Sequence, residues 1–204
     1  MCASYGLGGS LPLDLEPLSE PEYATLIRDW IGEQDAGAKI TGKNARNLNP
    51  IVRAKPSGER YAQLAWWWLW LDAGGPVKFS AFNSRDDRLL RSWKRPFQAR
   101  AILPATWYVE KQGRFHLPSD DAFGIAALTS TVTLEDGSEL VSYSMVTRDA
   151  VGEAAEVWPR MPLVLPRDFH DEWLDPERAG DADLVAESRL ASESISHELT
   201  RMYS

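Results

Sequence analysis

Two hairpin signals in the middle of the chain most constrain its fold. The first joins the apolar stretch 101–110 to 115–118 through the turn Lys111-Gln112-Gly113-Arg114. The second joins 123–133 to 140–148 around Glu135-Asp136-Gly137. Apolar and β-branched runs separated by short glycine-containing turns are typical of antiparallel strand pairs. The sequence therefore predicts a mostly antiparallel sheet.

Helical patterns flank this sheet. Ser19-Glu20-Pro21-Glu22 has the form of a capping box with an early proline, and apolar residues follow at helical spacing until Asp35-Ala36-Gly37. We expect a loop over 38–46 and further helical segments at 152–157, 166–173 and from Asp181 onward. The predicted fold class is α+β, a strongly bent, mostly antiparallel sheet or open barrel flanked by a few helices. With 204 residues and no linker-like stretch, one domain over 1–204 is expected.

The most aromatic segment, 61–71, contains Trp66-Trp67-Trp68-Leu69-Trp70 and is bounded by glycines. These features predict a strand after an earlier one around Ile51. Alternate side chains of a strand point to opposite faces, so Trp67 is expected to face away from its three neighbouring tryptophans. One set could offer a stacking platform for unpaired bases. Burial on both faces is the competing interpretation.

Charge is distributed unevenly along the chain. The net charge is −8, which on its own argues against binding to nucleic acid. Both ends are acidic, but residues 36–114 contain fifteen lysines and arginines against five carboxylates. A solvated basic face is the ordinary explanation of such a block. Its overlap with the motifs described below favours contact with DNA phosphates instead.

Cys2 is the only cysteine and directly follows Met1. If Met1 is removed, one residue carries both a free α-amine and a thiol. The amine can condense with an aldehyde to an imine, and the thiol can then close a five-membered thiazolidine ring. The ordinary pKa values, about 8 for the amine and about 8.5 for the thiol, leave both groups partly reactive near neutral pH. The alternative is that a cysteine at position 2 has no function.

Five motifs occur in a recognisable order. They are Met1-Cys2 at the start, Asn47-Leu48-Asn49-Pro50, Phe82-Asn83-Ser84-Arg85, the segment from Arg100-Ala101-Ile102-Leu103-Pro104-Ala105 to Glu110, and Arg160-Met161-Pro162. In order and spacing, from residue 2 to about residue 174, the chain resembles the SOS-response-associated peptidase family. Members of that family open with Met-Cys and use the cysteine to capture abasic sites in single-stranded DNA.

The chain also departs from the family pattern. Trp158 stands where the family has a histidine two residues before the arginine of Arg-Met-Pro. Ala3-Ser4 replaces a Gly-Arg pair, and the tryptophan-rich segment replaces Trp-Gly-Leu-Ile-Pro. Indole cannot exchange a proton near neutral pH, so a proton-transfer group is missing. We expect no substitute from His116, which should lie on the opposite sheet face from Glu110, or from His170 and His197, which are expected to be exposed.

The resemblance implies a set of site residues. Cys2, Asn83 and Glu110 would be catalytic: Glu110, with its pKa raised by burial, would shuttle protons, and Asn83 would orient the cysteine or the sugar. The residues expected to contact DNA are Arg85, Trp67, Asn47, Pro50 and Arg160. The ordinary alternatives are an ion pair of Glu110 with Lys111 or Arg114, and of Arg85 with Asp86 or Asp87.

The function implied is that of a single-stranded-DNA-binding protein that traps abasic sites through Cys2. Two alternatives remain: a cysteine-dependent peptidase or amidohydrolase, and a DNA-binding relative with impaired chemistry because of Trp158. No cofactor, metal or membrane contact is expected. The protein is expected to be a cytoplasmic monomer, associated with the nucleoid when bound to DNA, since a lone cysteine and the lack of a signal sequence fit a reducing compartment.

Overall fold

The computed structural model describes residues 2–8, 15–40 and 47–202. Its centre is a barrel of five strands, β3 (Leu48–Ala54), β4 (Arg60–Trp67), β6 (Arg100–Ala105), β9 (Phe123–Thr133) and β10 (Glu139–Asp149). Neighbouring strands are antiparallel except β4 and β10, which run parallel, with Ser142 opposite Trp66. The pairing of β9 with β10 closes the ring. The predicted α+β class is confirmed, and the barrel is closed.

A second sheet holds the amino terminus against the barrel. Its strand order is β13 (Thr200–Met202), β8 (Gly113–His116), β7 (Trp107–Glu110), β1 (Ser4–Gly6) and β2 (Gly37–Lys39). All four pairings are antiparallel, and Tyr5 of β1 lies opposite Tyr108 of β7. The β1 strand is therefore paired on both sides, which fixes the backbone that follows Cys2.

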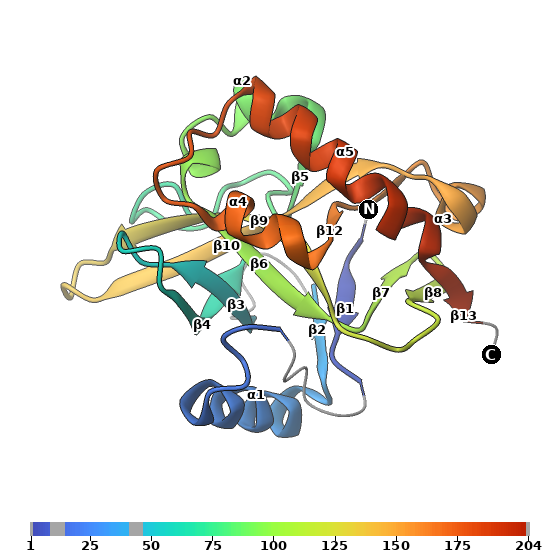
Figure 1. Ribbon diagram of the computed structural model, residues 1–204. Coiled ribbons are helices and arrows are strands. Elements are labelled where there is room, and N and C mark those ends of the chain that lie inside the picture. Colours follow the sequence, from blue (N-terminus) through green and yellow to red (C-terminus); the bar gives the residue numbers. More distant parts are fainter. Residues whose placement is uncertain (1, 9–14, 41–46, 203–204) are drawn as a thin grey trace.

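Three short strands extend the barrel edges: β5 (Asn83–Arg85), β11 (Arg160–Pro162) and β12 (Val164–Leu165). The helices are α1 (Pro21–Gln34), α2 (Leu89–Ser92), α3 (Gly152–Val157), α4 (His170–Leu174) and α5 (Ala182–Glu198), with 3₁₀ turns η1 (Asp86–Arg88), η2 (Pro96–Gln98) and η3 (Arg167–Phe169). In Figure 1, α1 and α5 lie on opposite sides of the strands. None of the described helices is long and apolar enough to cross a membrane.

Several local predictions need correction. The α1 helix begins one residue later than the capping box implies: Glu20 is its N-cap and makes no side-chain capping bond. The expected loop over 38–46 begins inside strand β2, which covers Gly37–Lys39, and residues 41–46 of that loop lie outside the described residues. The β7–β8 turn contains two residues instead of four, because Glu110 pairs with Gly113. The helix at 152–157 is confirmed.

The tryptophan segment is buried in its middle, at Trp67 and Trp68, whereas Trp66 and Trp70 are half-buried. Trp67 is only 1% exposed; its indole donates a hydrogen bond to the Phe82 carbonyl at 2.8 Å and stacks on Tyr143. Because the strand ends at Trp67, the alternation does not continue, and Trp68 is also buried. The predicted role of Trp67 as a stacking platform for DNA bases is therefore wrong, since a fully enclosed ring offers no face to a base.

Candidate active site

Cys2 lies in the protein interior. Its side chain is completely buried, and its Sγ donates a hydrogen bond to the Ser4 carbonyl at 3.3 Å. The pairing of β1 between β2 and β7 carries the residue into this position. A small, weakly polar thiol is among the side chains most readily buried. The Cys2 thiol is therefore enclosed by the protein.

Asn83 contacts Cys2 directly. Its Nδ2 donates a hydrogen bond of 2.6 Å to the Cys2 carbonyl, across 81 positions of sequence. The contact depends on β5, which pairs in parallel with β10 so that Asn83 lies opposite Met145. This hydrogen bond is compatible with the predicted role of Asn83 in orienting the cysteine, which stays a prediction.

Glu110 is buried at the end of β7. Strand alternation turns Tyr108 and Glu110 to the buried face, while Trp107 and Val109 are partly exposed. The Glu110 charge is one of the effects that raise the pKa of Cys2, so the two side chains are electrostatically coupled. A thiol, an amide and a carboxyl group from three separate strand regions thus lie close together.

Burial dominates the behaviour of the thiol. It raises the pKa of Cys2 to about 12, and the negative charge of Glu110 adds to the increase, while the hydrogen bond to Ser4 partly opposes it. The thiol is therefore protonated near neutral pH. A protonated, enclosed thiol is a weak nucleophile toward reagents in solution.

This state of Cys2 predicts slow alkylation. At pH 7.5 the folded protein should react with iodoacetamide at least about a hundredfold more slowly than the same chain in urea, because a pKa higher by about three units leaves far less thiolate. The rate should rise with pH in the folded protein. Equal rates for the folded and unfolded chains, followed by mass spectrometry, would show that the thiol is accessible and ionised.

Trp158 occupies a partly exposed position after α3, next to the Glu110 turn. The Lys111 ammonium lies 3.9 Å from the centre of its ring, a cation–π contact. Lys111 has a positive φ of 55°, as the two-residue turn requires. The family pattern described above has a histidine at this position. This chain instead has an indole ring in contact with a lysine ammonium.

No described histidine takes the place of that imidazole. His116 lies opposite Trp107, and its side chain is on the other sheet face from Glu110, as expected. His197 is exposed, as expected. His170 was expected to be exposed but is buried, with Nε2 at 3.2 Å from the Leu165 carbonyl.

A basic surface begins two residues after Asn83. We call the exposed cations Arg85, Arg88, Arg91, Lys94 and Arg95 the basic ridge. Arg85 forms a two-pronged ion pair with Asp87, at 2.9 and 2.7 Å, which is one of the predicted alternatives. Among the described residues, the other four have no ion-pair partner. These four cations can therefore contact phosphates directly. Arg85 can do so only if it gives up its ion pair with Asp87.

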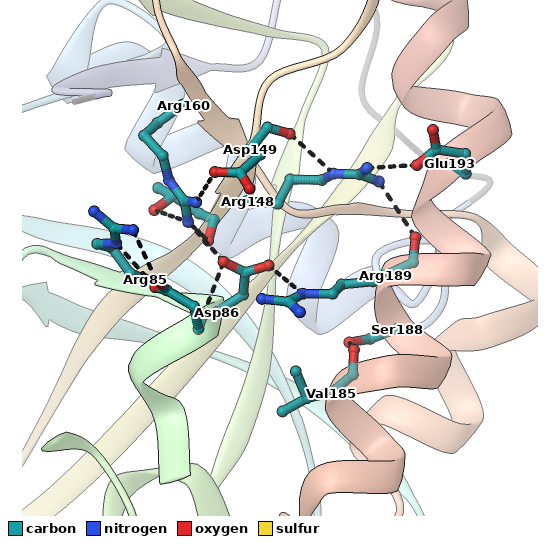
Figure 2. A network of polar contacts seen from close by, with 11 residues as sticks. Arg85, Asp86, Arg148, Asp149, Arg160, Val185, Ser188, Arg189 and Glu193 are labelled. Carbon is teal, nitrogen blue, oxygen red and sulfur yellow. Dashed lines mark hydrogen bonds and ion pairs between the residues drawn. The ribbon is translucent and has the colours of Figure 1, made fainter. Parts of the chain in front are cut away.

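Arg160 lies in a polar network with Asp86 and Asp149 (Figure 2). It is largely buried, and it donates hydrogen bonds to Asp86 at 2.7 Å and Asp149 at 2.5 Å. Asp86 in turn accepts from Arg189 of α5 at 2.5 Å. The predicted contact of Arg160 with DNA is wrong in this structure, because its guanidinium is committed to carboxylates of the protein.

The remaining predicted DNA contacts lie at the start of β3. Pro50 is buried within the strand, so a contact of its ring with DNA is also wrong. The Asn47 side chain is partly exposed and donates to the Lys39 carbonyl at 2.7 Å, joining β3 to β2.

Among the described residues, no group of three histidine, cysteine or acidic side chains is placed to hold a metal ion.

Fold and site together define a class: a mostly antiparallel barrel whose amino-terminal cysteine lies beside a buried amide and a buried glutamate. The sequence model of a family described as SOS response associated peptidase (SRAP) matches residues 28–202, and the chain belongs to this family. The matched stretch contains Asn83, Glu110 and Arg160 and begins after Cys2. Among curated proteins none matches the chain.

Solved structures share the fold at low sequence identity. A protein from Bordetella bronchiseptica is 16% identical, with all of both chains covered and a TM-score of 0.67. One from Bacteroides thetaiotaomicron is 17% identical over 92% of this chain and 86% of the other, with a TM-score of 0.68. A phage-related protein from Bordetella bronchiseptica is 17% identical over 100% and 95%, with a TM-score of 0.58. All three were targets of a structural genomics programme, and the likeness concerns the fold.

Proposed function

We propose that this protein, once Met1 is removed, traps abasic sites of single-stranded DNA as a thiazolidine on Cys2. The observation that carries the proposal is the hydrogen bond from Asn83 to the Cys2 carbonyl, in an enclosed site that also contains Glu110. A fixed Cys2 backbone places the α-amine and the thiol in one orientation, which favours ring closure. The basic ridge follows the same β5 strand and supports DNA as the carrier of the aldehyde.

The chemistry uses both nucleophiles of Cys2 in turn. Opening of the abasic hemiacetal breaks the bond between C1′ and the ring oxygen and moves the C1′ hydroxyl proton to that oxygen, a transfer assigned to Glu110. The Cys2 amine then attacks C1′, and water leaves to give an imine. Finally the thiol sulfur bonds to C1′ while its proton passes to the nitrogen. This order suits a thiol that stays protonated until the last step.

Peptide hydrolysis through Cys2 is the second candidate, favoured by the family description. A cysteine hydrolase needs a thiolate, which enzymes obtain by lowering the thiol pKa with an adjacent imidazole or a helix N-terminus. Here burial raises the pKa of Cys2, and Trp158 stands at the histidine position. Both observations weigh against hydrolysis and leave aldehyde capture as the better supported function.

The experiment compares two forms of the protein, one released from a tag so that Cys2 comes first and one retaining Met1. Each is incubated with an abasic strand and with the same strand carrying an intact base. A band that survives heating in detergent is expected only for the processed form with the abasic strand. Cleavage of peptide substrates by the processed form, without such a band, would instead favour the hydrolase.

Binding to undamaged single-stranded DNA should depend steeply on salt despite the acidic composition, since the basic ridge would release counterions from the phosphates. Arg85→Ala should weaken binding by about fivefold, a typical effect of losing one charged contact. Asp87→Asn should strengthen binding, because it frees the Arg85 guanidinium.

The matched control for Arg85 is Lys39→Ala, an exposed cation of β2 outside the ridge, which should change affinity less. Fluorescence anisotropy at several salt concentrations measures all three variants. An Arg85→Ala protein that binds as tightly as the unmodified one would remove Arg85 from the proposed DNA contacts.

A further inference from the structure

One hydroxyl group of the site has no hydrogen-bond partner in the part of the chain that the structure describes. The Tyr108 side chain is completely buried, and its Oη makes no hydrogen bond to any described residue. Its ring stacks on Phe115 with centroids 5.1 Å apart. Buried hydroxyl groups are nearly always hydrogen-bonded, because an unsatisfied one destabilises the fold. An exception of this kind requires an explanation.

Position links this hydroxyl to the reacting groups. Tyr108 lies opposite Tyr5 of β1 and shares the buried face of β7 with Glu110. Burial, followed by the charges of Cys2 and Glu110, raises the pKa of Tyr108 far above its ordinary value. Tyr108 therefore remains protonated and can only be a neutral hydroxyl in this site.

The same site also contains a buried hydrogen-bond acceptor. Asn83 Oδ1 is also buried without a hydrogen-bond partner among the described residues, while Nδ2 of the same amide donates to Cys2. The site thus presents an unused donor on Tyr108 and an unused acceptor on Asn83. A ligand with hydroxyl groups, such as a sugar, satisfies both.

We propose that Tyr108 is a further catalytic residue, whose hydroxyl donates a hydrogen bond to the deoxyribose ring oxygen as the abasic hemiacetal opens. The inference rests on the proposed function and deepens it. Glu110 carries the proton from the C1′ hydroxyl to the ring oxygen, and Tyr108 keeps its own proton throughout. Its hydrogen bond stabilises the electron pair that collects on the ring oxygen as the C1′ bond breaks.

Tyr5 provides the matched control. Tyr5 is equally buried, and its pKa is also affected by the charge of Cys2. Its hydroxyl, however, forms a hydrogen bond of 2.7 Å with the hydroxyl of Tyr143. Tyr5→Phe therefore removes a used hydroxyl and Tyr108→Phe an unused one. Thermal unfolding should separate them: Tyr5→Phe lowers the melting temperature, whereas Tyr108→Phe leaves it unchanged or raises it.

The rate test uses two DNA strands in single-turnover reactions of the processed protein. One strand carries the natural abasic deoxyribose, and the other carries a simple alkyl aldehyde that has no ring to open. Tyr108→Phe should slow adduct formation with the first by about tenfold or more and leave the second unchanged. Tyr5→Phe should not change the ratio of the two rates.

The outcomes separate this inference from the proposed function. Suppose that the unmodified protein reacts with both strands. A role of Tyr108 in ring opening is then overturned if the Tyr108→Phe protein forms the abasic adduct at the unmodified rate, or if it reacts more slowly with both strands by the same factor. If the unmodified protein reacts with neither strand, the proposed function itself fails, and the inference fails with it.

Discussion

Replacing Cys2 with alanine is expected to abolish the heat-stable adduct between the processed protein and an abasic strand. Alanine retains the α-amine but lacks the sulfur that closes the thiazolidine, so any bond to the aldehyde stays a reversible imine. The buried position adds a structural cost of about 1 kcal/mol, from the small cavity that the sulfur leaves. Denaturing gels measure the adduct, and urea unfolding checks the fold.

Cys2→Ser is the matched control, since it keeps the amine and a polar atom of similar size. Its product should disappear on heating but be trapped by borohydride, which reduces an imine to a stable amine. A heat-stable adduct in either variant without borohydride would mean that the sulfur plays no part in the bond. The thiazolidine route would then have to be abandoned.

Asp86→Ala is expected to lower the free energy of unfolding by about 3–5 kcal/mol, the range found when one partner of a buried ion pair is removed. Asp86 is 4% exposed and accepts from both Arg160 and Arg189. Its loss leaves the buried Arg160 guanidinium without its buried counter-charge. Because Asp86 follows β5 directly, we also expect Asn83 to lose its fixed position and adduct formation to slow.

Asp149→Ala is the matched control for this prediction. Asp149 pairs with the same arginine at 2.5 Å, but its side chain is 87% exposed. An exposed ion pair contributes at most about 1 kcal/mol, so the free energy of unfolding of this variant should be close to that of the unmodified protein. Equal losses in the two variants, measured by urea denaturation, would contradict a special role for the buried carboxylate.

Local patterns in the sequence predicted the hairpins and the helix at 152–157 because both depend on neighbouring residues. Closure of the barrel was not predictable in the same way. It depends on the parallel pairing of β4 with β10, between segments about eighty residues apart, which no local pattern encodes. The three-residue strands β2 and β13 escaped notice for a related reason: their remote partners define them, and their own residue pattern does not.

The candidate site was predictable only in part. Resemblance to a family pointed to Cys2, Asn83 and Glu110, and the structure brings Asn83 into contact with Cys2 and couples Glu110 to it electrostatically. Trp67 and Arg160 were misassigned because neither strand alternation nor a family resemblance reports burial, and the fold buries both. The partners of Arg160 come from η1 and β10, and no spacing rule links them in sequence. Tyr108 gave no signal, since an unsatisfied hydroxyl is visible only in three dimensions.

Intact-mass spectrometry of the processed protein after incubation with a short abasic strand tests the central claim most directly. The account predicts one species at the summed masses of protein and strand less one water, stable to heating, with the bond localised to Cys2 by fragmentation. The same protein retaining Met1 should give only the two separate masses. A processed protein that stays at its own mass with excess abasic strand, or a bond at another residue, would contradict the account.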